Sequence, residues 1–240
     1  MKTISMTAYN RPDYLKNTLL DLSKNNNSDW HFFISVDPSD NTDSIKQILT
    51  QNYGFASSTI VINSQRKDHR RNQHDAIAMA FNAGSAFNLH FDDDLFISPM
   101  ALELANYYKR TFKDKPLTYG NYGLFNYNSN PNEPNRLLSQ NAFTGLGTCY
   151  FRENWLNIFH KYWFSDDLAK KHFGQHVYGW DWQISGVYKE FDIHEIFPSF
   201  SRTNHRGREQ GTCCSHEWHD KVFANLIWDA EGLIVKDFIL

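Results

Sequence analysis

The sequence has little cysteine, little net charge and no long apolar run. Its three cysteines, Cys149, Cys213 and Cys214, are an odd number without C-x-x-C spacing, which favours neither a disulfide framework nor a zinc ribbon. The formal net charge of -3 gives no general attraction to nucleic acid or to a membrane. No segment approaches the roughly 20 apolar residues of a membrane span, and the apolar run at the N-terminus is too short and polar for a signal peptide. We therefore expect a cytoplasmic protein, located in a host cell if its source is a phage or a virus.

The sequence does contain enough apolar residues for one large core. Its 240 residues are 41% hydrophobic and 16% aromatic. No internal repeat, low-complexity tract or Gly/Ser linker divides them, so we expect a single domain over 1–240. One local basic patch, "RKDHRR" at 66–71, is available to a polyanion.

The first half of the chain alternates strand-like with helix-like segments. The first helix-like segment has Pro12 in its first turn and places Leu15, Leu19 and Leu22 on one face. Four strands separated by helices predict an α/β fold with a mostly parallel central sheet and helices on both faces, as in nucleotide-binding proteins. The predicted strands are 3–9, 31–37, 58–63 and 86–91, and the predicted helices are 11–24, 41–53 and 71–84.

The second half is less regular. Residues 119–141 are rich in Asn, Tyr, Gly and Pro and predict a long loop or a hairpin. Residues 201–220 are polar and show no periodicity. We predict a helix at 98–113 before these segments, and between them strands at 144–151 and 193–200 and helices at 152–163 and 180–191.

Three consecutive carboxylates follow the fourth predicted strand, in "LHFDDDLFISP" at 89–99. Asp92, Asp93 and Asp94 could form a solvated acidic turn that caps the next helix. They could instead hold Mg²⁺ or Mn²⁺, which take oxygen ligands and often keep substrate phosphates in their coordination shell. Ligands of parallel α/β sheets bind beyond the carboxyl ends of the strands, where these residues and Asp37 fall, and this position favours the metal site.

Two further motifs leave alternatives open. Asp181 lies between Trp180 and Trp182, and apolar neighbours would raise the pKa of its carboxyl and suit it to act as a general base. An Asp at this position is equally typical of a helix N-cap. The segment "CCSHEWH" contains metal-ligand residue types, but it lacks the separated ligand pairs of structural zinc sites.

Several segments together resemble a known family. They are "ISMTAYNRPDYLKNTLLDL", "FFISVDPSD", "LHFDDDLFISP", "GWDWQIS" and "SRTNHRGREQGTCCSHEWHD", which occur in the family's order between residue 3 and about residue 220. The chain resembles a nucleotide-sugar glycosyltransferase of the GT-A fold, and most of all the N-acetylglucosaminyltransferase I family. The resemblance implies a metal-dependent inverting glycosyltransferase, with a nucleotide-sugar-binding half at 1–115 and an acceptor-binding, catalytic half at 116–240.

The resemblance implies roles for the acidic residues. Asp94 would bind the metal, Mn²⁺ or Mg²⁺, while Asp92 and Asp93 would hold the ribose. Asp37 would accept a hydrogen bond from N3–H of uracil, which indicates a UDP-sugar as the donor. Asp181 would be the catalytic base.

The resemblance also implies roles for cationic residues. Arg11 and His74 would line the nucleotide pocket. Without the resemblance, Arg11 would be interpreted as a solvated residue at a helix start and His74 as a histidine on a helix surface. The loop at 201–220 would close over the donor, hinged at Gly207 and Gly211. Its cations Arg202, His205, Arg206 and Arg208 suit a diphosphate.

Three functional hypotheses follow. The first is transfer of a sugar from a UDP-sugar to a hydroxyl of a glycan, a lipid-linked saccharide or a protein. The second is the same chemistry on a hydroxymethylated base of DNA, with 66–71 holding phosphates. The third is a nucleotide-sugar-binding module without catalysis.

Overall fold

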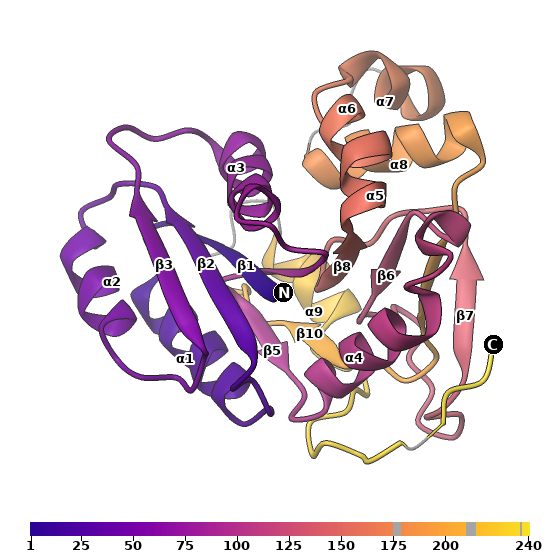
Figure 1. Ribbon diagram of the computed structural model, residues 1–240, viewed down its shortest axis with the longest axis horizontal. Coiled ribbons are helices and arrows are strands. Elements are labelled where there is room, and N and C mark those ends of the chain that lie inside the picture. Colours follow the sequence, from indigo (N-terminus) through magenta and orange to yellow (C-terminus); the bar gives the residue numbers. More distant parts are fainter. Residues whose placement is uncertain (175–178, 210–214, 236) are drawn as a thin grey trace.

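One sheet runs through the molecule in Figure 1, a computed structural model that describes residues 1–174, 179–209, 215–235 and 237–240. The order of its eight strands is β3-β2-β1-β4-β8-β6-β9-β7, and a separate small sheet pairs β5 with β10. The strands are β1 (Lys2–Ala8), β2 (Trp30–Val36), β3 (Ser57–Ile62), β4 (Phe87–Asp92), β5 (Leu95–Ile97), β6 (Asn121–Gly123), β7 (Leu137–Gln140), β8 (Thr148–Phe151), β9 (Glu195–Pro198) and β10 (Thr203–His205).

The first four strands are parallel to one another. β1 lies between β2 and β4, and β3 pairs with the outer side of β2. Because these strands run in one direction, their carboxyl ends at Ala8, Val36 and Asp92 meet at the same edge of the sheet. The loops that follow Ala8, Val36 and Asp92 therefore surround a common space.

The other half of the sheet is mixed. β8 is antiparallel to β4 and β6, β7 is antiparallel to β9, and β6 is parallel to β9. Four of the seven pairings are parallel, so the sheet is mostly parallel, as the sequence predicts.

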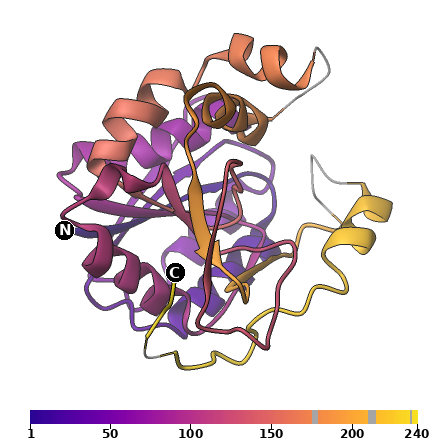
Figure 2. The same cartoon turned by 90° about the vertical axis from the view of Figure 1, so that its right-hand side faces the viewer.

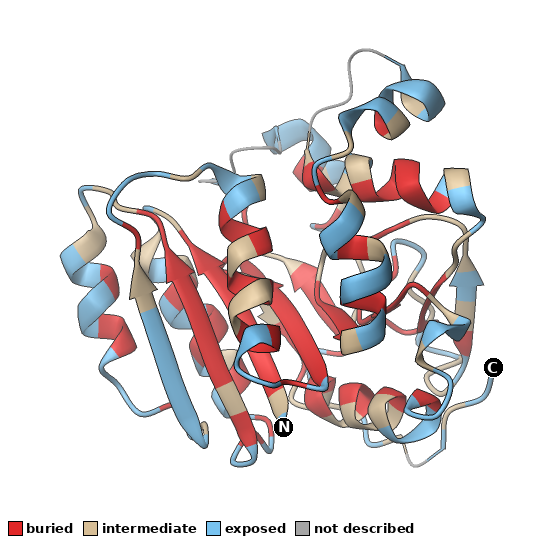
Figure 3. Cartoon of the chain, turned by 45° about the horizontal axis from the view of Figure 1, so that its top comes forward, coloured by how far each residue is buried: buried red, intermediate tan, exposed pale blue. Residues whose placement is uncertain are grey.

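Helices cover both faces of this sheet, which confirms the predicted fold class (Figures 1 and 3). One face carries α1 (Pro12–Ser23), α2 (Thr42–Leu49) and α4 (Ala101–Phe112). The other carries α3 (His69–Asn82), the consecutive short helices α5 (Arg152–Asn154) and α6 (His160–Tyr162), α7 (Asp166–Phe173) and α8 (Trp180–Phe191). Figure 2 shows α9 (His216–Val222) standing at the side, before the C-terminal segment.

Each face has its own apolar core. Leu15, Leu19 and Leu22 are fully buried in the first core, as the predicted helix face requires. Strand β8 contributes to both cores because successive side chains of a strand point to opposite faces: Cys149 faces the first and Tyr150 the second.

The second half of the chain differs most from the sequence predictions. The predicted loop at 119–141 contains β6 and β7, which are too short to show a period. The predicted helix 152–163 is interrupted by a π-helical turn at Trp155–Phe159, and the aperiodic stretch 201–220 contains β10 and part of α9. Among the described residues, we find no helix long and apolar enough to cross a membrane.

Candidate active site

A cavity of about 390 Å³ lies at the carboxyl edge of the parallel strands. Its mouth carries the guanidinium of Arg66, 4.3 Å from the centre of the Tyr9 ring. The cavity is lined by Thr7, Ala8, Tyr9, Asn10, Arg11, Asp37, Asn41, Arg66, His69, Asn72, Asp92 and Asp93. Five of the residues assigned from sequence, Arg11, Asp37 and Asp92 to Asp94, thus lie in or beside one space.

Asp37 is buried at one side of this cavity, directly after β2. Its Oδ1 accepts a hydrogen bond from the amide of Asn63 at 2.8 Å, and its Oδ2 accepts one from the backbone N–H of Lys67 at 3.1 Å. These bonds fix the orientation of the carboxylate, and each oxygen retains a lone pair for a ligand.

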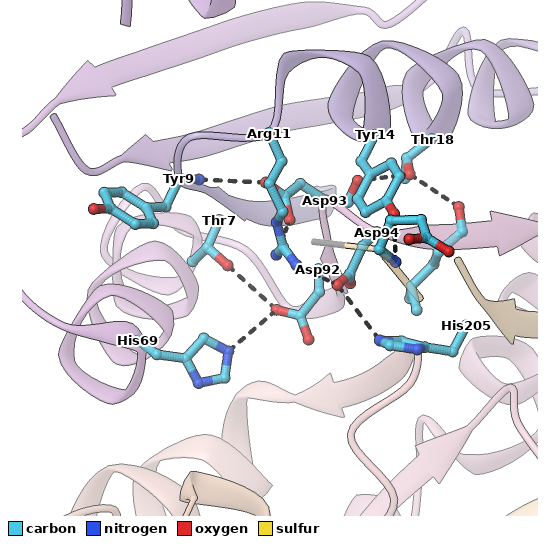
Figure 4. Close-up of polar contacts among 12 residues, drawn as sticks. Thr7, Tyr9, Arg11, Tyr14, Thr18, His69, Asp92, Asp93, Asp94 and His205 are labelled. Atoms are coloured by element: carbon cyan, nitrogen blue, oxygen red, sulfur yellow. Dashed lines mark hydrogen bonds and ion pairs between the residues drawn. The ribbon is translucent and has the colours of Figure 1, made fainter. Parts of the chain in front are cut away.

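The three aspartates occupy the turn between β4 and β5 (Figure 4). The hydroxyl of Thr18 in α1 lies 2.9 Å from both the carbonyl of Asp93 and that of Leu95. This hydroxyl ties the turn to α1. The acidic turn is therefore held by α1 as well as by the strands β4 and β5 that flank it.

Each aspartate has a different set of partners. Asp92 accepts hydrogen bonds from Gln73 at 2.6 Å and Thr7 at 3.3 Å. Asp93 is paired with Arg11, and its Oδ2 accepts the backbone N–H of Tyr9 at 3.3 Å. Asp94 lies 2.5 Å from the other terminal nitrogen of Arg11. Figure 4 shows Arg11 bridging the two carboxylates from above.

Because their partners differ, the three carboxyl groups have different pKa values. Burial raises the pKa of Asp93 to about 7, although the charge of Arg11 opposes this effect. Burial would also raise the pKa of Asp94, but His205 and Arg11 outweigh it and hold that pKa well below its usual range. Asp94 is therefore the most firmly ionised member of the cluster.

His205 reaches Asp94 through the small sheet. β10 pairs antiparallel with β5, and this pairing puts His205 opposite Leu95 and its Nε2 3.4 Å from Oδ2 of Asp94. A Cβ atom added at Gly207 would lie 2.6 Å from Oδ2 of Asp94, so only glycine fits beside this carboxylate. From the sequence, His205 is only one of several cations in a polar segment. Its strand has three residues, which is too short to show the alternation that predicts a strand.

A divalent cation fits Asp94 and His205 by the chemistry of the donors. A carboxylate oxygen and a histidine nitrogen suit Mn²⁺, and the carboxylate suits Mg²⁺. Among residues 1–174, 179–209, 215–235 and 237–240, no three His, Cys, Asp or Glu side chains are placed to hold a metal ion together. A cation here would need further ligands, such as the oxygens of a diphosphate. The described part of the segment "CCSHEWH" provides no set of three metal ligands either. Cys213 and Cys214 lie outside the described residues, and so does the predicted hinge residue Gly211.

Asp181 lies in the first turn of α8, after Gly179. Burial is the main cause of its raised pKa, and the charges of His69 and Asp92 also act on it. Its neighbour Trp180 packs inward, stacked on Trp163 at 5.2 Å. The N-cap residue of this helix is Gly179, which has no side chain, and the backbone N–H groups of Asp181 and Trp182 instead donate to the Asp181 carboxylate and act to lower its pKa.

The structure places three other predicted site residues away from the cavity. His74 is buried against the π-helical turn and α6, with its ring against Trp155 and its Nε2 3.1 Å from Nδ1 of His160. Arg202 is buried in an ion pair with Asp229 and donates to a backbone carbonyl. Arg208 is paired with Asp220 at 2.6 Å.

His69 and Gln73, which the sequence analysis did not select, occupy the place expected for His74. They are one helical turn apart on α3, with their side chains 2.8 Å apart, and both face Asp92. Desolvation lowers the pKa of His69, but the Asp92 carboxylate outweighs it and the pKa is raised. The sequence feature that could have identified them is their i, i+4 spacing in "HRRNQ", which puts both side chains on one face of the helix.

Comparison with known proteins agrees with this geometry. The sequence matches Glycosyl transferase family 2 over residues 3–173. A search of curated protein sequences gives no match. Two of the solved structures that match are the mannosyltransferase PcManGT from Pyrobaculum calidifontis, in complex with GDP-Man and Mn²⁺, and TarS 1–349 from S. aureus.

Both structures share the fold at low sequence identity. The first is 14% identical with a TM-score of 0.53, covering 82% of this chain and 54% of its own. The second is 10% identical with a TM-score of 0.59, covering 87% of this chain and 61% of its own. The chain thus spans little more than half the length of these structures.

The comparisons confirm the GT-A fold and the glycosyltransferase class. The finer resemblance to the N-acetylglucosaminyltransferase I family receives no support from them. Family match, fold and the acidic edge of the parallel sheet agree with one another, and the chain belongs to glycosyl transferase family 2.

Proposed function

We propose that this glycosyltransferase moves a sugar from a UDP-sugar to an acceptor hydroxyl, with a divalent cation and with inversion at the anomeric carbon. The observation that carries the proposal is the single cavity with Asp37 on one wall and the Asp92–Asp94 turn on another. The solved mannosyltransferase with the same fold is in complex with GDP-Man and Mn²⁺, which supports a nucleotide sugar and a metal.

Asp37 would recognise the base, which the proposal takes to be uracil. The buried carboxylate is an acceptor held by two donors, and N3–H of uracil would be its third; guanine also has N–H donors, so a comparison of UDP- with GDP-sugars decides between the two bases. Asp92 and Asp93 would then accept hydrogen bonds from the ribose hydroxyls.

Asp94 and His205 would hold Mn²⁺ or Mg²⁺ together with the diphosphate. The bound cation would stabilise the negative charge that grows on the β-phosphate as the sugar leaves. His69 lies beside Asp92, whose carboxylate raises the pKa of His69 and so favours its cationic form on the same side of the cavity. Arg202 has no place in this proposal because its guanidinium is buried in another ion pair.

Asp181 would act as the general base. A carboxyl with a raised pKa takes a proton more readily from the acceptor hydroxyl. The acceptor oxygen then bonds to the anomeric carbon as the bond from that carbon to the diphosphate breaks, and attack opposite the leaving group inverts configuration. In this arrangement residues 1–115 hold the donor, and residues 116–240 hold the acceptor within the same domain.

A glycan, a lipid-linked saccharide or a protein hydroxyl is favoured over modified DNA as the acceptor. Two side chains of the basic patch at 66–71 already have carboxylate partners in the protein: Lys67 pairs with Asp75, and Arg70 pairs with Asp166. The charges of Arg66 and Arg71 remain, but two arginines are a small part of the basic surface that a phosphate backbone requires.

Release of nucleoside diphosphate from a panel of UDP- and GDP-sugars tests the proposal. We expect slow release of UDP from at least one UDP-sugar, dependent on Mn²⁺ or Mg²⁺ and lost in Asp94→Asn. A binding module without catalysis would release none. Release of GDP alone would contradict the assignment of Asp37 to uracil.

A further inference from the structure

Arg11 holds two of the three carboxylates of the acidic cluster, Asp93 and Asp94. Its two terminal nitrogens bind one carboxylate each, Asp93 and Asp94, the latter at 2.5 Å. The side chains of all three residues are largely buried, with exposed fractions of 16% for Arg11, 2% for Asp93 and 8% for Asp94. This bridge is part of the cavity wall and is shielded from solvent.

The backbone is shaped to hold Arg11 at this place. Asn10 has a φ of 56°, in the left-handed region that non-glycine residues rarely adopt. The amide of Asn41 stabilises this turn by donating to the side-chain oxygen of Asn10 at 3.0 Å. Arg11 follows as the residue before α1, so its side chain starts at a fixed point above the acidic turn (Figure 4).

Arg11 is also the permanent countercharge of the cluster. Among the described residues, the cationic groups within ion-pair distance of the three aspartates are Arg11, His69 and His205. Only the guanidinium keeps its charge at every physiological pH. Without it, buried carboxylates would be left uncompensated, which is strongly unfavourable.

Arg11 and a metal ion compete for the same atom. Oδ2 of Asp94 is the oxygen that Arg11 contacts and the one nearest to Nε2 of His205. A cation bound there at a ligand distance of about 2.1 Å would lie against the guanidinium, and like charges at that separation repel. A metal at this oxygen would therefore weaken the contact between Arg11 and Asp94.

A diphosphate in the cavity would give Arg11 a new partner. Arg11 already lines the cavity, and a guanidinium binds phosphate oxygens through two parallel hydrogen bonds. We propose that Arg11 occupies the metal site of the empty enzyme and transfers to the donor diphosphate, so that cation and donor bind together and neither binds well alone. This inference rests on the proposed metal site and donor site. By linkage, the donor must then raise metal affinity by the factor by which the metal raises donor affinity.

Mn²⁺ binding, measured by electron paramagnetic resonance with and without UDP, tests this coupling. In Arg11→Gln, Mn²⁺ alone should bind at least about tenfold tighter than in the wild type, and the further gain from UDP should shrink by a similar factor. Arg110→Gln, which removes an exposed arginine paired with Glu103, is the matched control and should behave as the wild type. The double variant Arg11→Gln/Asp94→Asn should lose the tightened binding, which assigns it to Asp94.

The outcomes separate this inference from the proposed function. If the wild type with UDP binds no Mn²⁺, the proposed function fails. If it does bind Mn²⁺ with UDP, but Arg11→Gln binds Mn²⁺ alone no tighter than the wild type, only the coupling role of Arg11 is overturned. Should Arg11→Gln not fold, the wild type alone decides, because the inference requires UDP to tighten Mn²⁺ binding. A wild-type Mn²⁺ affinity that UDP leaves unchanged overturns the inference.

Discussion

Nε2 of His205 lies 3.4 Å from Oδ2 of Asp94, although His205 belongs to β10 and Asp94 to the turn between β4 and β5, far apart in the chain. The pairing of β10 with β5 creates this relationship. If both side chains hold the cation, His205→Ala should weaken Mn²⁺ binding in the presence of UDP by about 10- to 100-fold, as is typical for groups that contact or orient a metal. Calorimetric titration measures this loss.

His31→Ala is the control for His205→Ala, because His31 contacts Ser57 at the opposite end of the parallel strands. Equal Mn²⁺ affinity in all three proteins would show that His205 is not a ligand.

The sequence predicted the first half of the fold because its signals are local. Leu15, Leu19 and Leu22 repeat with the helical period, and the acidic turn directly follows an apolar strand. His69 lines the cavity and His74 does not, for a simple geometric reason: five residues along a helix correspond to a rotation of about 140°. Without knowing which face of α3 meets the sheet, the sequence cannot tell which histidine enters the cavity.

Other parts of the site depend on distant partners. Arg202 reads as a free cation in a polar loop, but its partner Asp229 lies outside every recognised motif. β10 has only three residues and is defined by its pairing with β5. Such features follow from tertiary contacts, so no local pattern could reveal them.

Asp181→Asn tests the catalytic base. Loss of a general base typically lowers turnover by about 10²- to 10⁴-fold, while an amide of the same shape should leave donor binding unchanged. Turnover by the coupled release of UDP and donor affinity by calorimetry separate the two effects. Asp192→Asn, at the exposed C-terminal end of the same helix, is the control. Normal turnover in Asp181→Asn would remove this residue from the mechanism.

Asp37→Asn tests recognition of the base. The new amide would direct its NH₂ group at a donor, either the Asn63 amide or the Lys67 N–H, and would lose an acceptor for uracil. We expect UDP binding with Mn²⁺ to weaken by about 1–3 kcal/mol. Binding of pyrophosphate with Mn²⁺, which lacks a base, should not change. An equal loss for both ligands would argue for a general structural role.

Glu195 predicts a pH dependence of stability that is separate from the active site. It is fully buried between β6 and β7, where Asn121, Gln140 and Thr144 donate to it, and burial raises its pKa from 4.5 to about 7. The folded protein therefore binds this proton more tightly than the unfolded chain. The stabilisation is complete below pH 4.5 and is lost as the pH rises through about 7.

Urea unfolding between pH 5 and pH 8 measures the contribution of Glu195. The free energy of unfolding of the wild type should fall over this interval by about 2–3 kcal/mol more than that of Glu195→Gln, which has no proton to lose. Identical pH profiles for the two proteins would mean that Glu195 titrates alike in the folded and unfolded chain.

The most direct test of the proposed nucleotide-sugar site is a thermal-shift panel of UDP- and GDP-sugars with and without Mn²⁺, because a ligand of the native state raises its melting temperature. We expect at least one UDP-sugar to raise the melting temperature of the wild type when Mn²⁺ is present. It should do so much less without the cation, and not at all in Asp94→Asn. A panel in which no nucleotide sugar changes the melting temperature of the wild type, with or without Mn²⁺, would contradict the account.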